Sequence, residues 1–192
     1  MNFKNDIDAC LNGLNKGGII LYPTDTIWGI GCDATNEKAV AKIYALKERE
    51  EKKSLIILLA EESDIPLYAK TPSKIIKEHF KNYTAPLTII YPDAKNFAAN
   101  LIQEDNTIAI RIVRDAFCKE LINAIGKPIV STSANISGEA SPANFDAIKP
   151  KIKNGVDLIV QHRREDQAFS KHSRTRKRDV NTAIDIIKKG LK

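Results

Sequence analysis

Short apolar runs along the chain alternate with stretches in which apolar residues return every three or four positions. The runs predict buried strands at 19–22, 54–60, 87–91, 107–113, 128–131, 156–160 and 183–187. The helical spacing predicts helices at 6–14, 36–46, 71–80 and 115–125. Strands that alternate with helices predict an α/β fold, and the mixture of short connections with long crossovers predicts a mixed sheet.

Polar residues at the ends of the helical stretches predict where the helices begin and end. Asp6, Asn36 and Asp115 stand at three starts, where a side-chain oxygen can accept a hydrogen bond from a free backbone N–H group. Gly126 follows the last stretch and can adopt the left-handed conformation that closes a helix. We therefore expect these residues to be helix caps.

The length and the cysteine content favour a single cytoplasmic domain. A chain of 192 residues can bury a sizeable core, and we expect one domain over 1–192. No apolar run approaches the roughly 20 residues of a membrane span, and the N-terminus lacks the layout of a signal peptide. Cys10, Cys32 and Cys118 fit no zinc or disulfide spacing, so we expect buried thiols in a reducing cytoplasm, no metal site and no membrane contact.

The positive charge is concentrated late in the chain. The net charge is +6, and residues 161–178 hold seven Lys or Arg against two Asp or Glu. The rest of the chain is close to neutral, so the basic pI by itself is weak support for nucleic-acid binding. Because the segment also lacks hydrophobic periodicity, we predict that 161–178 is poorly ordered or forms a mobile flap.

Polar side chains crowd the ten residues YPTDTIWGIG, at 22–31, directly behind the first predicted strand. Thr24, Asp25 and Thr26 offer two hydroxyls and a carboxylate, which suit an amino or hydroxyl group of a small ligand. A second interpretation is purely structural, because a proline and an aspartate favour a turn and the two glycines favour a second bend. The stretch alone leaves both interpretations open.

Three cations stand out beside or inside predicted strands. Lys47 and Arg49 follow a predicted helix, and in an extended loop their side chains would converge on an anion such as a phosphate or a carboxylate. They could equally form a solvated helix end, where cations favour the helix dipole. Arg111 interrupts the apolar run TIAIRIV, so it needs a partner unless it lies on the solvated side of its strand.

A row of hydroxyls, STSANISG at 131–138, follows the predicted strand at 128–131. Ser131, Ser133 and Asn135 could present oxygens and backbone N–H groups to a phosphate-like ligand. No histidine lies nearby and no G-x-S-x-G sequence is present, which argues against a Ser-His-Asp hydrolase. The glycines match neither a Walker loop nor a dinucleotide fingerprint, so a bound nucleotide would need another architecture.

Five segments in series resemble the YrdC/Sua5 family of threonylcarbamoyl-AMP synthases. In chain order they are YPTDTIWGIG, KER with KKSLIILLA, APLTIIYP, TIAIRIV and STSANISGEASP, between about 17 and 145. Each segment is weakly specific alone, and the five in the family's order are strongly specific. The resemblance implies the short, single-domain form, with a twisted open mixed sheet and flanking helices around a basic concave groove.

The resemblance implies an enzyme, a nucleotidyltransferase that makes L-threonylcarbamoyladenylate from L-threonine, bicarbonate and ATP, with Mg²⁺ on the phosphates and release of pyrophosphate. The product would serve the N6-threonylcarbamoyl modification of adenosine 37 in tRNA, through downstream threonylcarbamoyl transferase proteins. Contact with tRNA or double-stranded RNA is a further expectation. The alternative is a relative that kept the groove and binds RNA or nucleotide without synthase activity, as an RNA maturation factor would.

The resemblance also gives roles to the polar clusters. Lys47 and Arg49 match the family's K-x-R signature and would be the catalytic cations, meeting both phosphates and carboxylates. The implied threonine and bicarbonate site consists of Thr24, Asp25, Thr26, Arg111 and Ser133. The implied ATP site consists of Lys47, Arg49, Lys53, Ser131, Ser133, Asn135 and Ser173.

Three segments depart from the family pattern, and the largest departure is late in the chain; the other two are Thr84-Ala85-Pro86 in place of PGP and Arg111-Ile112-Val113 in place of R-x-P. The family closes its nucleotide site with a proline, hydroxyls and an apolar strand, whereas residues 171–178 read KHSRTRKR. Ser173 can match the family serine, but a buried strand cannot hold three consecutive cations without partners. We therefore expect this part of the site to lie on the surface or to be rebuilt.

Overall fold

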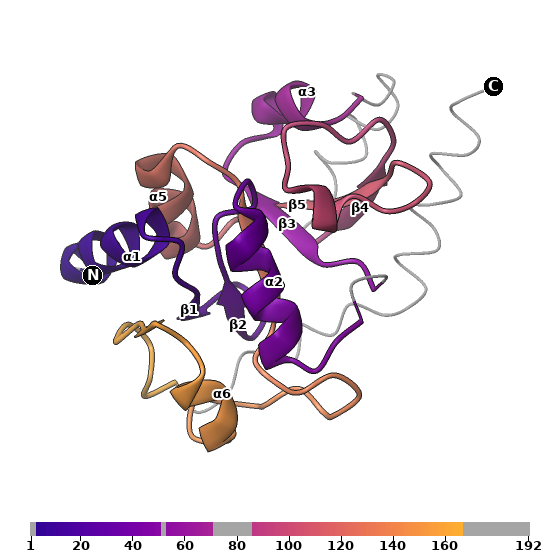
Figure 1. The fold of residues 1–192 in the computed structure, drawn as a ribbon. Helices are drawn as coiled ribbons and strands as arrows, with labels where there is room; N and C mark the ends of the chain where they lie inside the picture. The colour runs from indigo at the N-terminus through magenta and orange to yellow at the C-terminus, as the bar shows by residue number, and fades with distance from the viewer. Residues whose placement is uncertain (1–2, 51–52, 71–85, 167–192) are drawn as a thin grey trace.

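A mixed sheet forms the centre of the molecule in the computed structural model, which describes residues 3–50, 53–70 and 86–166 (Figure 1). Its strands are β1 Ile20–Pro23, β2 Trp28–Gly31, β3 Ile56–Leu59, β4 Thr88–Tyr91, β5 Ile108–Ile112, β6 Ile129–Ser133 and β7 Leu158–Ile159. Their order in the sheet is β4-β5-β3-β6-β2-β1-β7. Neighbours are antiparallel except for the parallel pairs β3–β5 and β1–β7, so the predicted mixed α/β sheet is confirmed.

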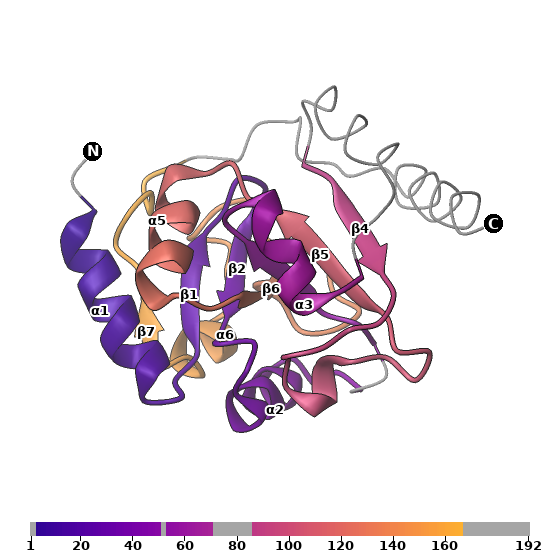
Figure 2. The ribbon, with the colours of Figure 1, turned by 90° about the horizontal axis from the view of Figure 1, so that it is seen from above.

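Helices cover both faces of the sheet. One face carries α1 (Lys4–Asn15) and α5 (Ala116–Ile125), which lie side by side, and the other carries α2 (Glu37–Leu46) (Figures 1 and 2). The shorter elements are η1 Glu62–Asp64, α3 Ile65–Tyr68, η2 Ala99–Leu101 and α6 Pro150–Asn154. The sequence did not predict α6, because five residues hold too little periodicity to reveal a helix.

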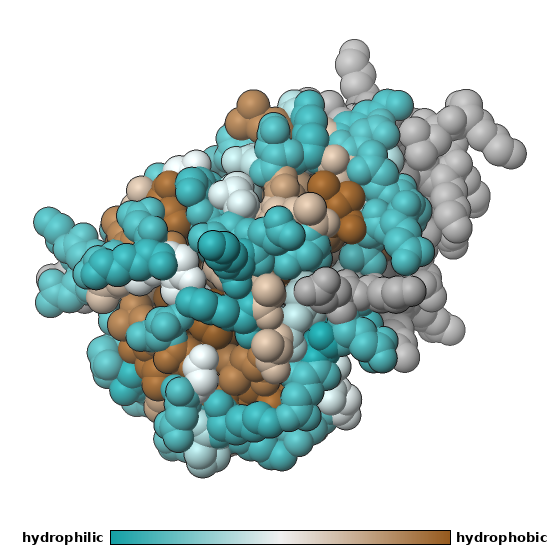
Figure 3. Space-filling model, in the orientation of Figure 1, coloured by the Kyte–Doolittle hydropathy of each residue, from teal (hydrophilic) through white to brown (hydrophobic). Residues whose placement is uncertain are grey.

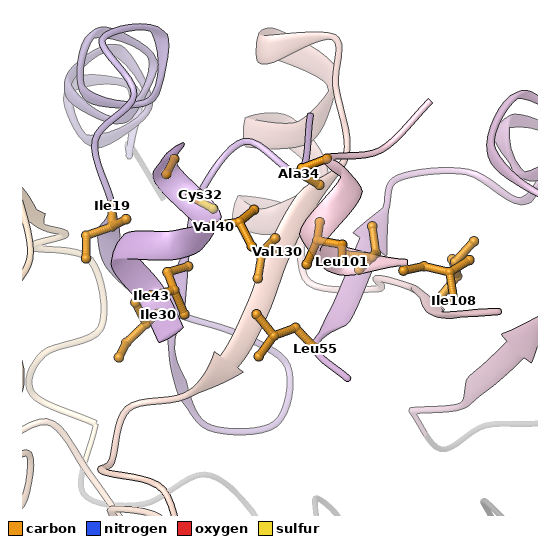
Figure 4. Close-up of a cluster of buried hydrophobic side chains, with 14 of the residues drawn as sticks. Ile19, Ile30, Cys32, Ala34, Val40, Ile43, Leu55, Leu101, Ile108 and Val130 are labelled. Carbon is orange, nitrogen blue, oxygen red and sulfur yellow. The ribbon is translucent and has the colours of Figure 1, made fainter. Parts of the chain in front are cut away.

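The alternation of side chains along the strands divides the core into two clusters, because successive residues of a strand point to opposite faces. Ile20 and Leu58 pack in the cluster under α1 and α5. Leu21 and Val130 pack in the cluster under α2, which Figure 4 shows with Val40 of that helix. Both faces of the sheet are therefore covered by apolar contacts, which explains why the strands read as continuous apolar runs rather than as alternating ones.

The predicted strands and helices that fall on described residues are confirmed, with ends that shift by about two residues at most. Asn36 caps α2 by accepting a hydrogen bond from the Ala39 N–H at 3.1 Å. Asp115 caps α5 in the same way, and Gly126 ends it with a left-handed φ of 66°. The predicted helix at 71–80 and the predicted strand at 183–187 lie outside the described residues.

The predicted cap at Asp6 is wrong. Helix α1 begins earlier, at Lys4, so that Asp6 lies inside its first turn. The carboxylate of Asp6 instead accepts hydrogen bonds from the backbone N–H groups of Gln161 and His162, at 3.0 Å and 2.9 Å. The Asp6 carboxylate thus binds a segment more than 150 positions away in the sequence, instead of capping the helix as the local pattern predicted.

The predicted bend at Gly29 and Gly31 is also wrong, because both residues belong to strand β2. This strand pairs with β1 on one side and with β6 on the other. A Cβ atom on Gly31 would lie 2.6 Å from both the Tyr22 ring and the Val130 carbonyl oxygen. The glycine therefore serves a close approach of neighbouring strands rather than a change of direction.

The three cysteines are buried free thiols, as the sequence predicted. Burial first, and then the charge of Asp6, raise the pKa of Cys10 to about 12. Burial also raises the pKa of Cys32 and of Cys118. All three thiols stay protonated at neutral pH, so they act as core residues rather than as nucleophiles.

On the face shown in Figure 3, polar side chains surround several hydrophobic patches. Within the described ranges, Leu67 in α3 is the large hydrophobic residue that stays exposed, at 59%. The same ranges contain no helix that is both long enough and apolar enough to span a bilayer.

The contact at Gly31 predicts a large difference between two glycine substitutions. We expect Gly31→Ala to lower the free energy of unfolding by about 1–3 kcal/mol, because the new methyl group meets backbone and a packed ring. Gly13→Ala should raise it by about 0.5–1 kcal/mol, because Gly13 lies in helix α1 with nothing within 4 Å of the new atom. Urea unfolding of both variants measures the difference, and equal stability would contradict the packing described.

Candidate active site

A pocket of about 300 Å³ lies where strands β5 and β6 meet the β1–β2 turn. Two arginines and seven hydroxyl side chains line it, and no acidic side chain of the described residues does. The cations are Arg49 and Arg111, and the hydroxyls belong to Thr24, Thr26, Ser54, Ser131, Thr132, Ser133 and Ser141. Cations with neutral hydroxyls, and no carboxylate among them, suit an anionic ligand.

The sheet register brings residues from four strands to this pocket. The strands pair Gly29 with Ser133, Ser131 with Ile56, and Leu58 with Arg111. Directly paired residues and residues two apart in a strand point to the same face, so all six share one face. Leu58 packs in the cluster under α1 and α5, so the pocket occupies a part of that face beyond these helices.

The β1–β2 turn is built around the hydroxyl of Thr24. Its oxygen accepts hydrogen bonds from the backbone N–H groups of Thr26 and Ile27, at 3.1 Å and 3.2 Å. It donates its own proton to the Ile27 carbonyl at 2.7 Å, and the Thr26 hydroxyl lies 3.0 Å away. The stretch is thus a turn, as the structural interpretation expected, and Thr24 and Thr26 also line the pocket.

Arg111 points into the protein, so of the two interpretations the buried one is correct. The residue is 6% exposed, and its Nη2 lies 3.2 Å from Asp25 Oδ1 while its Nη1 donates to the Thr26 hydroxyl at 3.3 Å. A charge at such a depth requires a partner of this kind. Asp25 stands behind Arg111 and is not part of the pocket lining.

The Arg111–Asp25 pair keeps unused hydrogen-bonding capacity. Neither carboxylate oxygen of Asp25 makes an aligned hydrogen bond with any described residue, and neither does Nε of Arg111. These atoms are buried behind the pocket wall. The pair is therefore compensated in charge by proximity rather than by an aligned hydrogen bond.

Lys47 turns away from the pocket and into the protein. The expected extended loop is wrong, because Lys47 is still helical and Glu48 has a left-handed φ of 51°. The Lys47 ammonium donates to the carbonyl oxygens of Ser133 and Asn135, each at 2.5 Å. Burial first, and then the charge of Arg49, lower the pKa of Lys47 to about 8. Lys47 thus stabilises the end of β6 and the loop after it by donating hydrogen bonds to two of their backbone carbonyls.

Arg49 does line the pocket, and its guanidinium is fixed to the chain that enters β3. Its Nε donates to the Lys53 carbonyl at 3.2 Å, and its Nη2 donates to the Ser54 carbonyl at 2.8 Å. Lys53 itself is exposed, and its amine lies 3.9 Å from Glu50 rather than at the pocket. The two cations of the K-x-R signature therefore have different surroundings, and only Arg49 faces the cavity.

The loop after β6 brings part of the predicted hydroxyl row to the pocket. Ser131 and Ser133 line it, whereas the side-chain amide of Asn135 donates to the carbonyls of Ile136 and Glu139. Asn135 is buried, and its Oδ1 has no partner among the described residues. Ser131 and Ser133 therefore face a ligand directly, while Asn135 shapes the loop.

Sequence reasoning missed several lining residues and named others that cannot be placed. Ser54, Thr132 and Ser141 line the pocket. Thr132 pairs with Ile30 of β2 and the Ser54 carbonyl binds Arg49, so long-range contacts, which no local pattern reveals, bring these two residues to the site. Ser173 lies outside the described residues, as do the other residues of 167–178 in the basic segment. Residues 161–166 are described and contact the body of the protein, so the prediction of a mobile 161–178 segment stays a prediction.

The residues around the pocket do not form a metal-binding cluster. Within 3–50, 53–70 and 86–166 there is no group of three or more His, Cys, Asp or Glu side chains placed to hold an ion. Asp25, the carboxylate of the β1–β2 turn, forms an ion pair with Arg111.

Comparison with known proteins places this site in a family. The model of the Sua5, YciO and YrdC proteins, described as telomere recombination, matches residues 12–187. The chain belongs to this family. All the described pocket residues fall within the matched range.

Curated relatives in this family share most of their length with the chain. The threonylcarbamoyl-AMP synthase of Pseudoalteromonas translucida is 36% identical over 163 residues, which cover 83% of this chain and 87% of that protein. The threonylcarbamoyl-AMP synthase of Wigglesworthia glossinidia brevipalpis is 33% identical over 165 residues, which cover 84% of each.

Solved structures confirm the fold. The P. abyssi Sua5 structure complexed with L-threonine superposes with a TM-score of 0.75 at 26% identity, covering 83% of this chain. This chain spans about half of that protein, 47% of its length. The E. coli YciO structure has a TM-score of 0.72 at 24% identity and supports the fold alone.

The different surroundings of Lys47 and Arg49 predict different effects on stability. We expect Lys47→Met to lower the free energy of unfolding by about 2–4 kcal/mol, because two carbonyls lose their only charged donor. Arg49→Met should lower it by less than about 1 kcal/mol, because its hydrogen bonds lie at the surface. Urea unfolding of the two matched variants tests this, and similar losses would show that Lys47 is not a structural support.

Proposed function

We propose that the protein is an L-threonylcarbamoyladenylate synthase, which condenses L-threonine, bicarbonate and ATP and releases pyrophosphate. The observation that carries the proposal is the pocket that Arg49 and Arg111 line together with seven hydroxyls. The curated relatives, named threonylcarbamoyl-AMP synthase at up to 36% identity, support the reaction, and the threonine complex of a related structure supports the substrate. In this reaction the enzyme would act as a nucleotidyltransferase.

The charge of the pocket suits the substrates. Bicarbonate, the carboxylate of threonine and the triphosphate of ATP are all anions, so bringing them together costs electrostatic energy. Arg49 and Arg111 would offset that repulsion, and a guanidinium can bind a carboxylate or a phosphate through two parallel hydrogen bonds. The hydroxyls of Thr24, Thr26 and Ser133 would bind the hydroxyl and amino groups of threonine, since hydroxyls both donate and accept.

The reaction needs positioning more than it needs a nucleophile on the protein. The neutral threonine amine would attack the carbon of CO₂ and lose a proton, or attack bicarbonate with loss of water; either path forms a carbamate. A carbamate oxygen would then attack the α-phosphorus of ATP, and the bond to pyrophosphate would break. Among the described residues the pocket offers no histidine or thiol for covalent catalysis, so the rate would come from orientation and from stabilisation of negative charge.

We also propose a cofactor, a cellular location and partners for the enzyme. ATP would be a substrate, and Mg²⁺ would arrive bound to its phosphates, supplying charge neutralisation there. The product would be used by threonylcarbamoyl transferase proteins to modify tRNA, in the cytoplasm. Direct binding of tRNA or double-stranded RNA stays a prediction.

The alternative, an RNA- or nucleotide-binding module without synthase activity, has less support. The relatives are named for an enzymatic activity, and a related structure binds L-threonine, which a module of that kind would not need. The described pocket also concentrates its cations within one cavity, whereas a basic surface stripe is typical of RNA binding.

Pyrophosphate release tests the proposed reaction. We expect release from L-threonine, bicarbonate and ATP with Mg²⁺ to exceed a control without threonine, and Arg111→Lys to reduce kcat/KM for threonine by about 100-fold, because the forked donor is lost. Arg114→Lys is the matched control, because Arg114 lies just beyond the same strand and outside the pocket lining. Release that does not depend on threonine would refute the synthase function, and full activity in Arg111→Lys would refute the role of Arg111.

A further inference from the structure

An arginine after β7 contacts the turn that lines the pocket. Arg163 Nη1 donates to the backbone carbonyl of Thr24 at 3.3 Å and to Asp115 Oδ2 at 3.1 Å. Its Nε donates to Asp166 Oδ2 at 2.6 Å. Arg163 is not among the described pocket-lining residues, and its described contact with the pocket wall is through the turn.

We propose that Arg163 is a positioning residue, which fixes the orientation of the Thr24–Asp25 peptide and thereby the threonine side of the pocket. The carbonyl that it binds belongs to the peptide whose N–H is that of Asp25. The orientation of this peptide sets where the Asp25 carboxylate lies, and Asp25 is the charge partner of Arg111. The kinetic consequence rests on the proposed synthase function, whereas the structural consequence does not.

The backbone around Arg163 is held on several sides. Its φ is 63°, in the left-handed region that residues with side chains adopt rarely, so this conformation persists only where contacts impose it. Asp6 accepts hydrogen bonds from the N–H groups of the two preceding residues. The ring of His162 packs against Phe3 and Phe117, with centroid distances of 5.1 Å and 5.5 Å, and these two rings also contact each other. These contacts of residues 161 and 162 thus keep the Arg163 side chain oriented toward the β1–β2 turn.

Asp115 connects Arg163 to helix α5. One carboxylate oxygen, Oδ1, caps the helix by accepting the Cys118 N–H at 2.9 Å, and the other, Oδ2, accepts from Arg163. The Asp115 side chain is 14% exposed and that of Arg163 is 24% exposed, so water screens this pair only in part. The pair therefore ties together the start of α5, the β1–β2 turn and the segment after β7.

The size of the effect follows from what remains when Arg163 is removed. The Thr24 hydroxyl still binds the N–H groups of Thr26 and Ile27 and the Ile27 carbonyl, so the turn keeps its path. The Thr24 carbonyl loses its charged donor, and the peptide before Asp25 becomes free to rotate. Threonine binding should therefore weaken severalfold, while Arg49, which Arg163 does not contact, keeps its place.

Amide hydrogen exchange tests the structural consequence without any substrate. In the full-length, ligand-free protein we expect Arg163→Met to speed exchange of the Thr26 and Ile27 amides by about five- to tenfold, because their local opening becomes easier. Arg164→Met is the matched control: Arg164 binds the carbonyls of Ile159 and Val160 and lies over the Phe145 ring, and none of these contacts is with residues 24–27 of the turn. Exchange at these two amides that is the same in both variants and in the wild type would overturn the proposal.

Kinetics tests the functional consequence. We expect Arg163→Met to raise KM for threonine by about five- to tenfold and to leave KM for ATP within about twofold, a split that a general loss of stability would not produce. Arg163→Lys should restore part of the effect, and Asp115→Asn, which keeps a capping oxygen, should reproduce part of it. Equal rises in both KM values would overturn the positioning role. Absence of pyrophosphate release in the wild type would refute the synthase function, and the exchange experiment would still decide the role of Arg163.

Discussion

The positive charge of Arg111, buried in strand β5, is the constraint on which the candidate site depends. Removing one partner of a buried ion pair commonly costs about 3–5 kcal/mol, because the remaining charge stays in a poorly solvating environment. Asp25 supplies the partner at 3.2 Å, and it lies in the β1–β2 turn that the hydrogen bonds of the Thr24 hydroxyl stabilise. The Arg111–Asp25 ion pair at the wall of the pocket is therefore stabilised by the turn, by the neighbouring strands and by the contact of Arg163 with the turn.

The cations at the site have two different roles. Arg49 and Arg111 line the cavity and can meet an anion, whereas Lys47 holds two backbone carbonyls beneath the loop after β6. That loop carries Ser133 into the pocket, so Lys47 can act on a ligand through the shape of the wall. A loss of activity after substitution of Lys47 would therefore have to be separated from a loss of stability before any catalytic role is assigned to it.

The success of sequence reasoning depended on how local each signal was. The caps at Asn36 and Asp115 and the helix end at Gly126 were predicted because neighbouring residues decide them. Asp6 was assigned wrongly because its partners, Gln161 and His162, stand more than 150 positions away. Strand β2 was missed because its glycines resemble a bend, and the need for them arises from the packing of β1 and β6 on either side. The direction of Lys47 depended on the helical backbone reaching Lys47, and the path of the chain beyond it depended on the left-handed Glu48, which no pattern of residue types reveals.

The central claim, that the arginines of this pocket bind the carboxylate of threonine, is tested most directly by calorimetry with two ligands. L-Threonine and L-threoninamide carry the same amine and hydroxyl, and at about pH 6 both amines are protonated, so the ligands differ in the carboxylate. The account predicts that the wild-type protein binds L-threoninamide at least about 30-fold more weakly than L-threonine, a difference of about 2 kcal/mol. Equal affinity for the two ligands would contradict it.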